Sequence, residues 1–223
     1  MKKFNILITS SLLILFSCND TNYKSPETEI EKMSYSLGVN VATGVQSQGI
    51  KDIDIDALSK AFNDVFEGNE LDISEEDGLQ ILQDYFAKIT EKQKTQATED
   101  GIAYLSENAN KEGVITTESG LQYEILKEGE GKKPSANDQV TVHYHGTLID
   151  GTVFDSSVDR GEPATFPVNG VIPGWVEALQ LMNTGSKWKL TIPANLAYGE
   201  RGAGGIIGPN TTLIFEVELI KIN

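Results

Sequence analysis

The sequence predicts an α+β protein with two domains: an all-helical N-terminal half, and a C-terminal half in which an antiparallel β-sheet wraps on a short α-helix. The first observation is that six of the seven prolines follow residue 113. The second is that apolar residues recur every three or four positions before that point and every second position after it. The third is length, because residues 114–223 are numerous enough to enclose a core of their own.

Three helices are predicted before residue 113, each from its own spacing of apolar side chains. The second is expected from about Asp56 through Leu58, Phe62 and Val65 to Gly68. The third has a capping-box-like start at Ser74 and Asp77 and continues through EKQKTQATED. The first begins near Glu27 and carries a stripe formed by Ile30, Met33, Leu37, Val41 and Val45.

The third helix is expected to reach about 35 residues, which is longer than a compact domain of this size can cover. We interpret it as a solvated rod that connects two bodies. The two shorter helices have too little apolar surface to enclose a core alone. We therefore expect residues 27–113 to form a dimerisation domain that packs against a second copy as a homodimer. A monomeric three-helix bundle is the alternative.

The C-terminal half shows the alternation typical of half-buried strands. Alternate residues from Val140 to Tyr144 are apolar, and Asp150-Gly151 predicts a hairpin that returns the chain through Phe154. Asp155 then follows at the rim of an apolar surface. Further strands are predicted at Leu121–Ile125, Trp188–Ile192 and Thr212–Ile220.

One short helix is predicted to start at Pro173-Gly174-Trp175. We expect Asn183-Thr184-Gly185 to stop it, with the glycine as a left-handed cap. Its apolar face would be formed by Trp175, Ala178, Leu179 and Met182.

Composition argues against several classes of partner. The formal charge is −15 at pH 7 and no basic stripe exists, so a nucleic-acid interface is not expected. A single cysteine allows neither an intramolecular disulfide nor a zinc site built on cysteine. His143 and His145 share one strand face, but no third ligand is evident. We expect no metal and no cofactor.

The first residues predict export from the cytoplasm. A basic Met-Lys-Lys, an apolar stretch to Phe16 and then Ser17-Cys18 resemble a bacterial lipoprotein leader. Residues 1–17 would be the signal peptide, Cys18 the lipidated mature N-terminus and residues 18–26 a polar tether. The protein would then be anchored by lipid to a membrane of the cell envelope. An ordinary cleaved signal peptide is the alternative.

Several motifs in one order resemble the FKBP-type peptidyl-prolyl isomerases, closest to the two-domain Mip/FkpA-like envelope members. The segment MSYSLGVNVATGVQSQG at 33–49 is similar to the start of that subgroup's dimerisation domain. The resemblance implies an FKBP-like fold for 114–223. Its motifs there are VHYHGTLIDGTVFDSS (142–157), VIPGWVEALQLM (171–182), LAYGERGAGGIIG (196–208) and TLIFEVELI (212–220).

The resemblance also implies a pocket that receives a proline ring. Ala164 and Ala203 depart from the best-known single-domain members, which carry an aromatic residue and a histidine there, so a wider groove is expected. Trp175 would be the floor. The implied catalytic groups are Tyr144, Asp155, Tyr198 and the backbone N–H of Ile172, and the implied substrate-binding residues are Phe154, Phe166, Val171, Trp175, Ile207 and Phe215.

The function implied is cis-trans isomerisation of X-Pro bonds in unfolded or nascent envelope proteins, with macrolide inhibitors of the FKBP class as expected ligands. An apolar pocket would favour the twisted amide, which is less dipolar than the planar forms. Two alternatives stay open. The protein could be mainly a dimeric periplasmic chaperone with secondary isomerase activity, or a module that only recognises Pro-containing segments.

Overall fold

The computed structural model describes residues 24–223, so the expectations for the leader at 1–17 and for Cys18 lie outside the described residues. Contacts divide the chain into two compact units, one that ends at Gln48 and one that spans Gly49–Asn223. Within the described range, no helix combines the length and the apolar character needed to cross a membrane.

The three predicted N-terminal helices are present. Helix α1 (Glu29–Ser47) starts with a capping box in which Thr28 and Glu31 satisfy each other's backbone N–H groups. Helix α2 (Ile55–Glu67) ends at Gly68, as predicted, and Gly68 has the left-handed conformation with a φ of 71°. Helix α1 has no buried residue, and its apolar stripe is exposed, as for Ile30 at 64% and Met33 at 51%.

Helix α3 (Glu75–Asn108) confirms the prediction of one long helix, and Ser74 caps it by accepting a hydrogen bond from the Asp77 N–H. The interpretation as a solvated rod is wrong for its C-terminal part, which docks against the β-rich domain. Asn108 is buried and donates hydrogen bonds to Gln122 at 2.9 Å and Thr191 at 3.3 Å. Burial of a polar side chain is unfavourable unless the side chain is hydrogen-bonded, so these two hydrogen bonds hold the end of the helix on the sheet.

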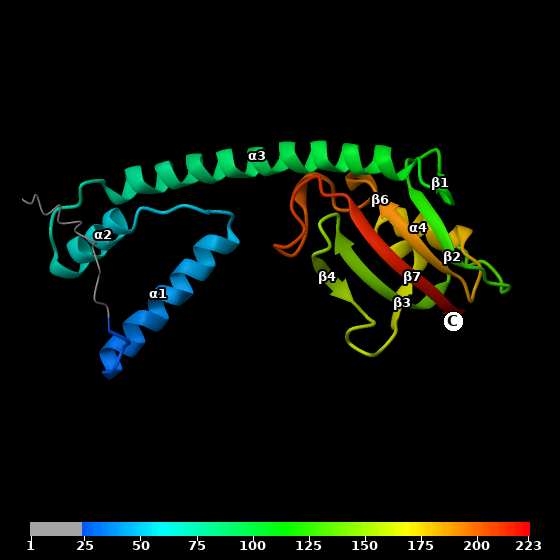
Figure 1. The fold of residues 1–223 in the computed structure, drawn as a ribbon, viewed down its shortest axis with the longest axis horizontal. Helices are drawn as coiled ribbons and strands as arrows, with labels where there is room; N and C mark the ends of the chain where they lie inside the picture. The colour runs from blue at the N-terminus through cyan, green and yellow to red at the C-terminus, as the bar shows by residue number, and fades with distance from the viewer. Residues whose placement is uncertain (1–23) are drawn as a thin grey trace, which may run out of the picture. The chain divides into compact units, whose positions relative to one another are not determined.

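The C-terminal domain is an antiparallel sheet of seven strands in the order β1-β2-β6-β7-β3-β4, with β5 paired to β3 (Figure 1). The strands predicted at 121–125, 188–192 and 212–220 are confirmed as β2, β6 and β7, and the hairpin predicted at Asp150-Gly151 joins β3 to β4. The strands are β1 (Val114–Thr116), β2 (Gln122–Lys127), β3 (Gln139–Leu148), β4 (Val153–Ser156), β5 (Ala164–Pro167), β6 (Lys187–Ile192) and β7 (Leu213–Ile222).

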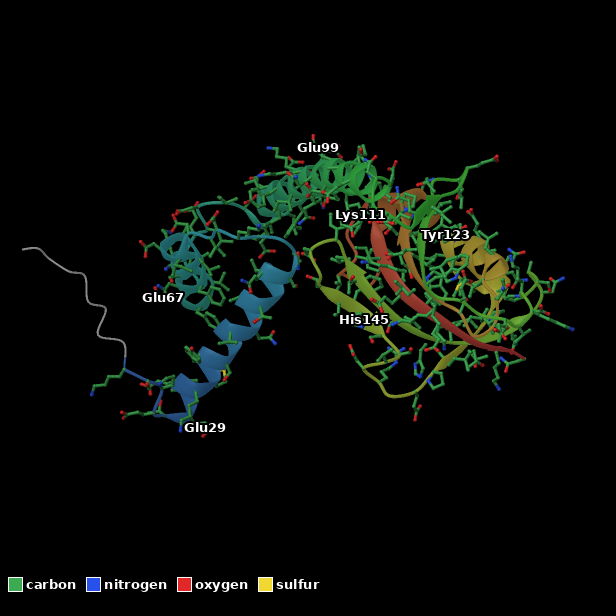
Figure 2. The ribbon with its side chains drawn as sticks, turned by 45° about the vertical axis from the view of Figure 1, so that its right-hand side comes forward. Glu29, Glu67, Glu99, Lys111, Tyr123 and His145 are labelled. Carbon is green, nitrogen blue, oxygen red and sulfur yellow. The ribbon has the colours of Figure 1, made fainter. Side chains whose placement is uncertain are left out.

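Helix α4 (Pro173–Leu181) packs on one face of this sheet and completes the core. Its predicted apolar face is buried, with Trp175 4% exposed and Ala178 fully covered. Alternate residues of β3 and β7 supply the facing layer. Tyr123, which Figure 2 labels, stacks on Trp188 of β6 with ring centroids 4.3 Å apart. The sheet is therefore curved around one short helix, as its alternation predicted.

The expected glycine cap of α4 is wrong. The helix ends at Leu181 and Met182 follows in extended conformation, while Gly185 uses its positive φ of 90° in the turn that leads into β6. The Ser186 N–H donates to the Asn183 carbonyl in this turn, and the Gly185 N–H donates to Leu219 on β7. The glycine is thus required by the sheet and not by the helix.

Candidate active site

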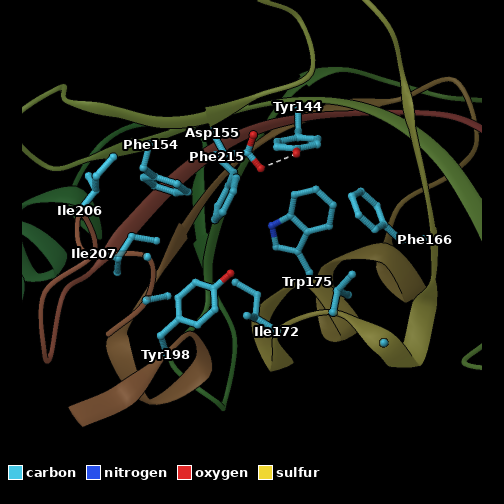
Figure 3. Close-up of a pocket in the computed structure, with 14 residues that line it drawn as sticks. Tyr144, Phe154, Asp155, Phe166, Ile172, Trp175, Tyr198, Ile206, Ile207 and Phe215 are labelled. Carbon is cyan, nitrogen blue, oxygen red and sulfur yellow. Dashed lines mark hydrogen bonds between the residues drawn. The ribbon is translucent and has the colours of Figure 1, made fainter. Parts of the chain in front are cut away.

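A pocket of about 570 Å³ opens between α4, the β3–β4 hairpin and the loop before β7 (Figure 3). This volume lies within the range of small-molecule and peptide-side-chain sites. Its wall is mainly aromatic and aliphatic. The lining residues that the sequence predicted are Tyr144, Phe154, Asp155, Phe166, Val171, Ile172, Trp175, Tyr198, Ile207 and Phe215.

Trp175 forms the floor of the pocket. It lies in the first turn of α4, where Pro173 occupies a helix start that needs no N–H donor. Three aromatic rings pack against the indole in edge-to-face geometry. The distances between ring centroids are 5.5 Å for Tyr144, 5.2 Å for Phe215 and 6.0 Å for Phe166. Such T-shaped pairs are favourable, so the floor is held rigid by its own walls.

The second wall is made by Phe154 and Phe215, whose rings are perpendicular with centroids 5.3 Å apart. They can approach because β3 has no side chain at Gly146. A Cβ built there would lie 2.7 Å from Phe154 and 2.8 Å from Phe215, which is closer than atoms can pack. The pocket wall therefore depends on a glycine within a strand, which is a recognised use of glycine where a side chain approaches the backbone.

Three polar groups form a closed hydrogen-bonded set at one edge of the pocket. The Tyr144 hydroxyl donates to the Asp155 carboxylate over 2.5 Å (Figure 3). Arg160 donates to the same carboxylate with Nη1 and to the Tyr144 hydroxyl oxygen with Nη2, the latter over 2.8 Å. Its guanidinium also lies 5.6 Å from the centre of the Tyr144 ring. This set fixes the orientation of the Tyr144 side chain.

These contacts lower the pKa of Asp155 and raise the pKa of Tyr144. Burial by itself raises the pKa of Asp155, but the hydrogen bonds from Tyr144 and Arg160 outweigh it and hold the pKa below its ordinary value. Burial, followed by the bond to Asp155, raises the pKa of the Tyr144 hydroxyl. The pair therefore stays an ionised carboxylate and a neutral phenol near neutral pH.

Two further polar groups face the pocket from other elements. Ile172 is the residue before α4, and its N–H donates to no other group among residues 24–223. Tyr198 precedes a turn of 3-10 helix and directs its hydroxyl into the pocket (Figure 3). Tyr198 is 42% exposed, so its hydroxyl is accessible to a ligand. A free N–H and a free hydroxyl suit a carbonyl oxygen as acceptor.

The structure also brings in residues that the sequence did not predict. Arg160 belongs to the polar set and Ile206 lines the rim. Of the two small residues singled out in the sequence, Ala203 lines the pocket, whereas Ala164 packs against the core. No signal in the sequence indicated the arginine, because its spacing from Asp155 does not show which carboxylate it contacts. Five positions carry the chain around a turn, which allows the two side chains to meet.

The glycine-rich loop at 202–208 forms a small hairpin at the rim of the pocket. Ala203 and Ile207 exchange two backbone hydrogen bonds, of 2.8 and 3.0 Å. His143 and His145 bond to Ser157 and Ser156 at the base of the β3–β4 hairpin. Between Lys24 and Asn223, no three His, Cys, Asp or Glu residues are grouped so that they could hold a metal ion.

Known proteins share both halves of this chain. Residues 130–220 match the family described as FKBP-type peptidyl-prolyl cis-trans isomerase, and residues 30–125 match the domain amino terminal to it. The FKBP-type 22 kDa peptidyl-prolyl cis-trans isomerase of Escherichia coli is 52% identical over 85% of this chain and 93% of its own length. The outer membrane protein MIP of Legionella longbeachae is 47% identical over 91% of this chain and 89% of its own. The crystal structure of FkpA from Escherichia coli has a TM-score of 0.67 at 37% identity and covers 89% of this chain and 99% of the other.

Proposed function

Because the chain belongs to the FKBP-type peptidyl-prolyl cis-trans isomerase family, we propose that it accelerates rotation about X-Pro bonds in proteins that fold in the cell envelope. The observation that carries the proposal is the mainly aromatic and aliphatic pocket floored by Trp175. Such a site offers a place for a proline ring and no nucleophile at the centre. Rotation about the X-Pro bond needs no nucleophile and no proton relay.

The physical reason lies in the amide itself. Resonance opposes rotation with a barrier of roughly 18–20 kcal/mol, so X-Pro bonds isomerise over about tens to hundreds of seconds. The twisted amide has lost conjugation and is less dipolar, so it leaves water more easily than the planar forms. An apolar pocket therefore favours the twisted state over both ground states and lowers the barrier.

We assign the roles as follows. The pyrrolidine ring rests on Trp175 between Tyr144, Phe154 and Phe215, while Phe166, Val171 and Ile207 cover its sides. The Ile172 N–H and the Tyr198 hydroxyl donate to substrate carbonyls and hold the chain during rotation. Asp155 acts as a positioning group: together with Arg160 it keeps the Tyr144 ring in place, which is consistent with the closed set of hydrogen bonds.

The test of this function is acceleration of a proline-limited reaction. We expect the chain from residue 19 onward, and the fragment 114–223, to speed the cis-to-trans relaxation of a short X-Pro peptide. A parallel assay with a proline-limited refolding protein compares the two forms on a larger substrate. No acceleration of even the short peptide would leave only a module that recognises Pro-containing segments.

Activity is expected to be independent of pH from about 5 to about 9. The pKa of Asp155 lies below the ordinary value of about 3.9 and that of Tyr144 above about 10, so neither changes state in this window. Because the folded pKa of Asp155 is lowered, its small contribution to stability is present above the unfolded value and is lost only as the pH falls through the folded one. The peptide assay across this range checks the prediction, and a titration midpoint between 6 and 8 in kcat/KM would contradict it.

The N-terminal half is proposed to be a dimerisation domain, with boundaries at 27–113 and the isomerase domain at 114–223. In support, apolar side chains remain exposed on all three N-terminal helices, such as Ile30 (64%), Phe66 (80%) and Leu79 (62%). Exposed apolar area of this kind marks interaction surfaces. Sedimentation of the chain from residue 19 onward as a dimer is expected, and a stable monomer at micromolar concentration would exclude the arrangement.

A chaperone is the second candidate, because the same exposed surface could hold non-native chains. Suppression of aggregation of a client without proline tests it apart from isomerisation. If full-length protein suppresses aggregation and fragment 114–223 does not, holding chains is the function of the helical half.

We further propose that residues 1–17 are a lipoprotein signal and that Cys18 carries the lipid that anchors the protein to an envelope membrane. The relative named outer membrane protein MIP is consistent with an envelope location. Incorporation of labelled fatty acid by the natural chain, and its loss in Cys18→Ala, is the expected result. An FKBP-class macrolide is expected to compete with the peptide for the pocket.

A further inference from the structure

Helix α3 contacts the loop that forms the pocket rim. We call residues 197–212, between β6 and β7, the rim loop. It contributes Tyr198, Ala203, Gly204, Ile206 and Ile207 to the pocket, which makes it the largest single source of lining residues. Its conformation therefore sets the shape of the entrance.

The rim loop is closed on itself through Asn210. The Asn210 N–H donates a hydrogen bond of 2.8 Å to the carbonyl of Gly199, the residue that follows Tyr198 in the sequence. Asn210 has a φ of 56°, and among residues 24–223 it is the one non-glycine residue with positive φ. This backbone conformation is unfavourable for most side chains and persists where surrounding contacts hold it.

The side chain of Asn210 supplies such a contact, to α3. Asn210 Nδ2 donates to Thr98 Oγ1 over 2.9 Å, and the Thr98 hydroxyl donates in turn to the Lys94 carbonyl over 2.7 Å. Lys94 Nζ pairs with Glu200 of the rim loop at 2.8 Å. Glu200 is 75% exposed, so this ion pair holds the loop weakly compared with the partly buried bond of Thr98.

The helix is pressed against the end of the same loop. A Cβ at Gly101 would lie 2.6 Å from Thr212 Oγ1, so only glycine permits this approach, and both residues are buried. Farther along, Asn108 anchors the helix to β2 and β6. Positions 94, 98, 101 and 108 follow the spacing of one helix face, whereas Glu99 is exposed on the outer side of α3 (Figure 2).

We propose that α3 is part of the active-site architecture and that Thr98 is a positioning residue for the isomerase pocket, acting through Asn210 on the rim loop. This inference rests on the proposed isomerase function for its catalytic consequence. The sheet-anchored end of α3 provides the fixed point, and Thr98 ties the loop to it. Loss of the tie lowers the fraction of molecules whose rim is in the binding-competent conformation, and apparent affinity falls by that fraction.

The experiment compares three variants of the chain from residue 19 onward. Thr98→Val keeps the shape of the side chain and removes both hydrogen bonds, whereas Thr98→Ser keeps the hydroxyl. Thr95→Val makes the same chemical change on the same helix, at an exposed residue that bonds only to the Glu91 carbonyl. Two readouts are measured: amide hydrogen exchange of the rim loop, and kcat/KM for a short X-Pro peptide.

We expect Thr98→Val to speed exchange at the N–H groups of Ala203, Ile207 and Asn210 by about three- to tenfold, the effect of one lost hydrogen bond. Amides of β3 and β7 should be unchanged and serve as the internal reference. The kcat/KM should fall by a smaller factor, because it follows the fraction of molecules with a closed rim loop whereas exchange follows the open fraction, with Thr98→Ser and Thr95→Val close to the wild type. Melting temperature is recorded to separate these local effects from general destabilisation.

Unchanged exchange at the three rim-loop amides in Thr98→Val would overturn the proposal, as would equal acceleration throughout β3 and β7 or an effect of the same size in Thr95→Val. Faster exchange with unchanged kcat/KM would overturn the catalytic part. If the wild type accelerates no X-Pro peptide, the proposed function fails while hydrogen exchange still decides whether α3 holds the rim loop. The two failures are therefore distinguishable.

Discussion

Gly146→Val is expected to lower kcat/KM for an X-Pro peptide by roughly hundredfold, since displacement of a site by about 1 Å can have an effect of this size. A Cβ at this position would meet Phe154 at 2.7 Å and Phe215 at 2.8 Å, and valine adds two further carbons. Both rings must move, and both are walls of the pocket. The free energy of unfolding is expected to fall by about 1–3 kcal/mol, as in other overpacked cores.

The control for this variant is Thr147→Val, the neighbouring position on β3, where a side chain of the same size already exists. A double-mutant cycle of Gly146→Ala with Phe154→Leu adds a direct test of the clash, because the smaller residue removes the nearest ring atoms. Positive coupling in stability between the two changes is expected. Wild-type activity in Gly146→Val would show that the wall formed by Phe154 and Phe215 does not define the site.

Asp155→Ala is expected to lower kcat/KM by roughly ten- to hundredfold, the equivalent of about 1.5–3 kcal/mol for lost hydrogen bonds to a charged group. The carboxylate accepts from both Tyr144 and Arg160, and its loss removes the hydrogen bond that orients the Tyr144 ring in the pocket wall. The fold should survive, because the Asp155 and Arg160 side chains are 44% and 53% exposed and exposed ion pairs contribute at most about 1 kcal/mol.

Asp159→Ala is the matched control, since it removes an aspartate from the turn that follows β4, at a side chain that is 64% exposed. Activity is measured with the peptide assay and stability by urea unfolding. Tyr198→Ala is also expected to lower kcat/KM, because it removes the hydroxyl that faces the pocket. The fold should survive, since Tyr198 is exposed and its loss leaves the core unchanged. Wild-type turnover in both variants would refute the assignment of the site.

Local pattern was sufficient to predict most of the fold. The alternation from Val140 to Tyr144, with the Asp150-Gly151 turn, predicted the β3–β4 hairpin because a period of two determines which side chains share a face. The same pattern failed to predict β1 and β5, which have only three and four residues and too few alternations to be recognised. The glycine cap of α4 failed because Gly185 satisfies a turn of the sheet.

The residues of the pocket were predictable because family motifs supplied their identities, and the structure places all ten of the predicted pocket residues on one pocket. The part played by Arg160 was not predicted, since nothing in its spacing shows which carboxylate it contacts. Gly146 carried no signal either. A glycine in a strand shows its purpose only when the atoms opposite it are known.

The sequence by itself determined the two-domain α+β architecture and the long helix, because these follow from periodicity, capping and composition, and its family motifs indicated the aromatic residues of the pocket. Only the tertiary structure decided that α3 lies against the rim loop and that Thr98 meets Asn210, 112 positions away. Periodicity describes neighbours along the chain. A polar contact between distant segments depends on how the whole domain folds, and the sequence around Thr98 does not indicate which segment its side chain contacts.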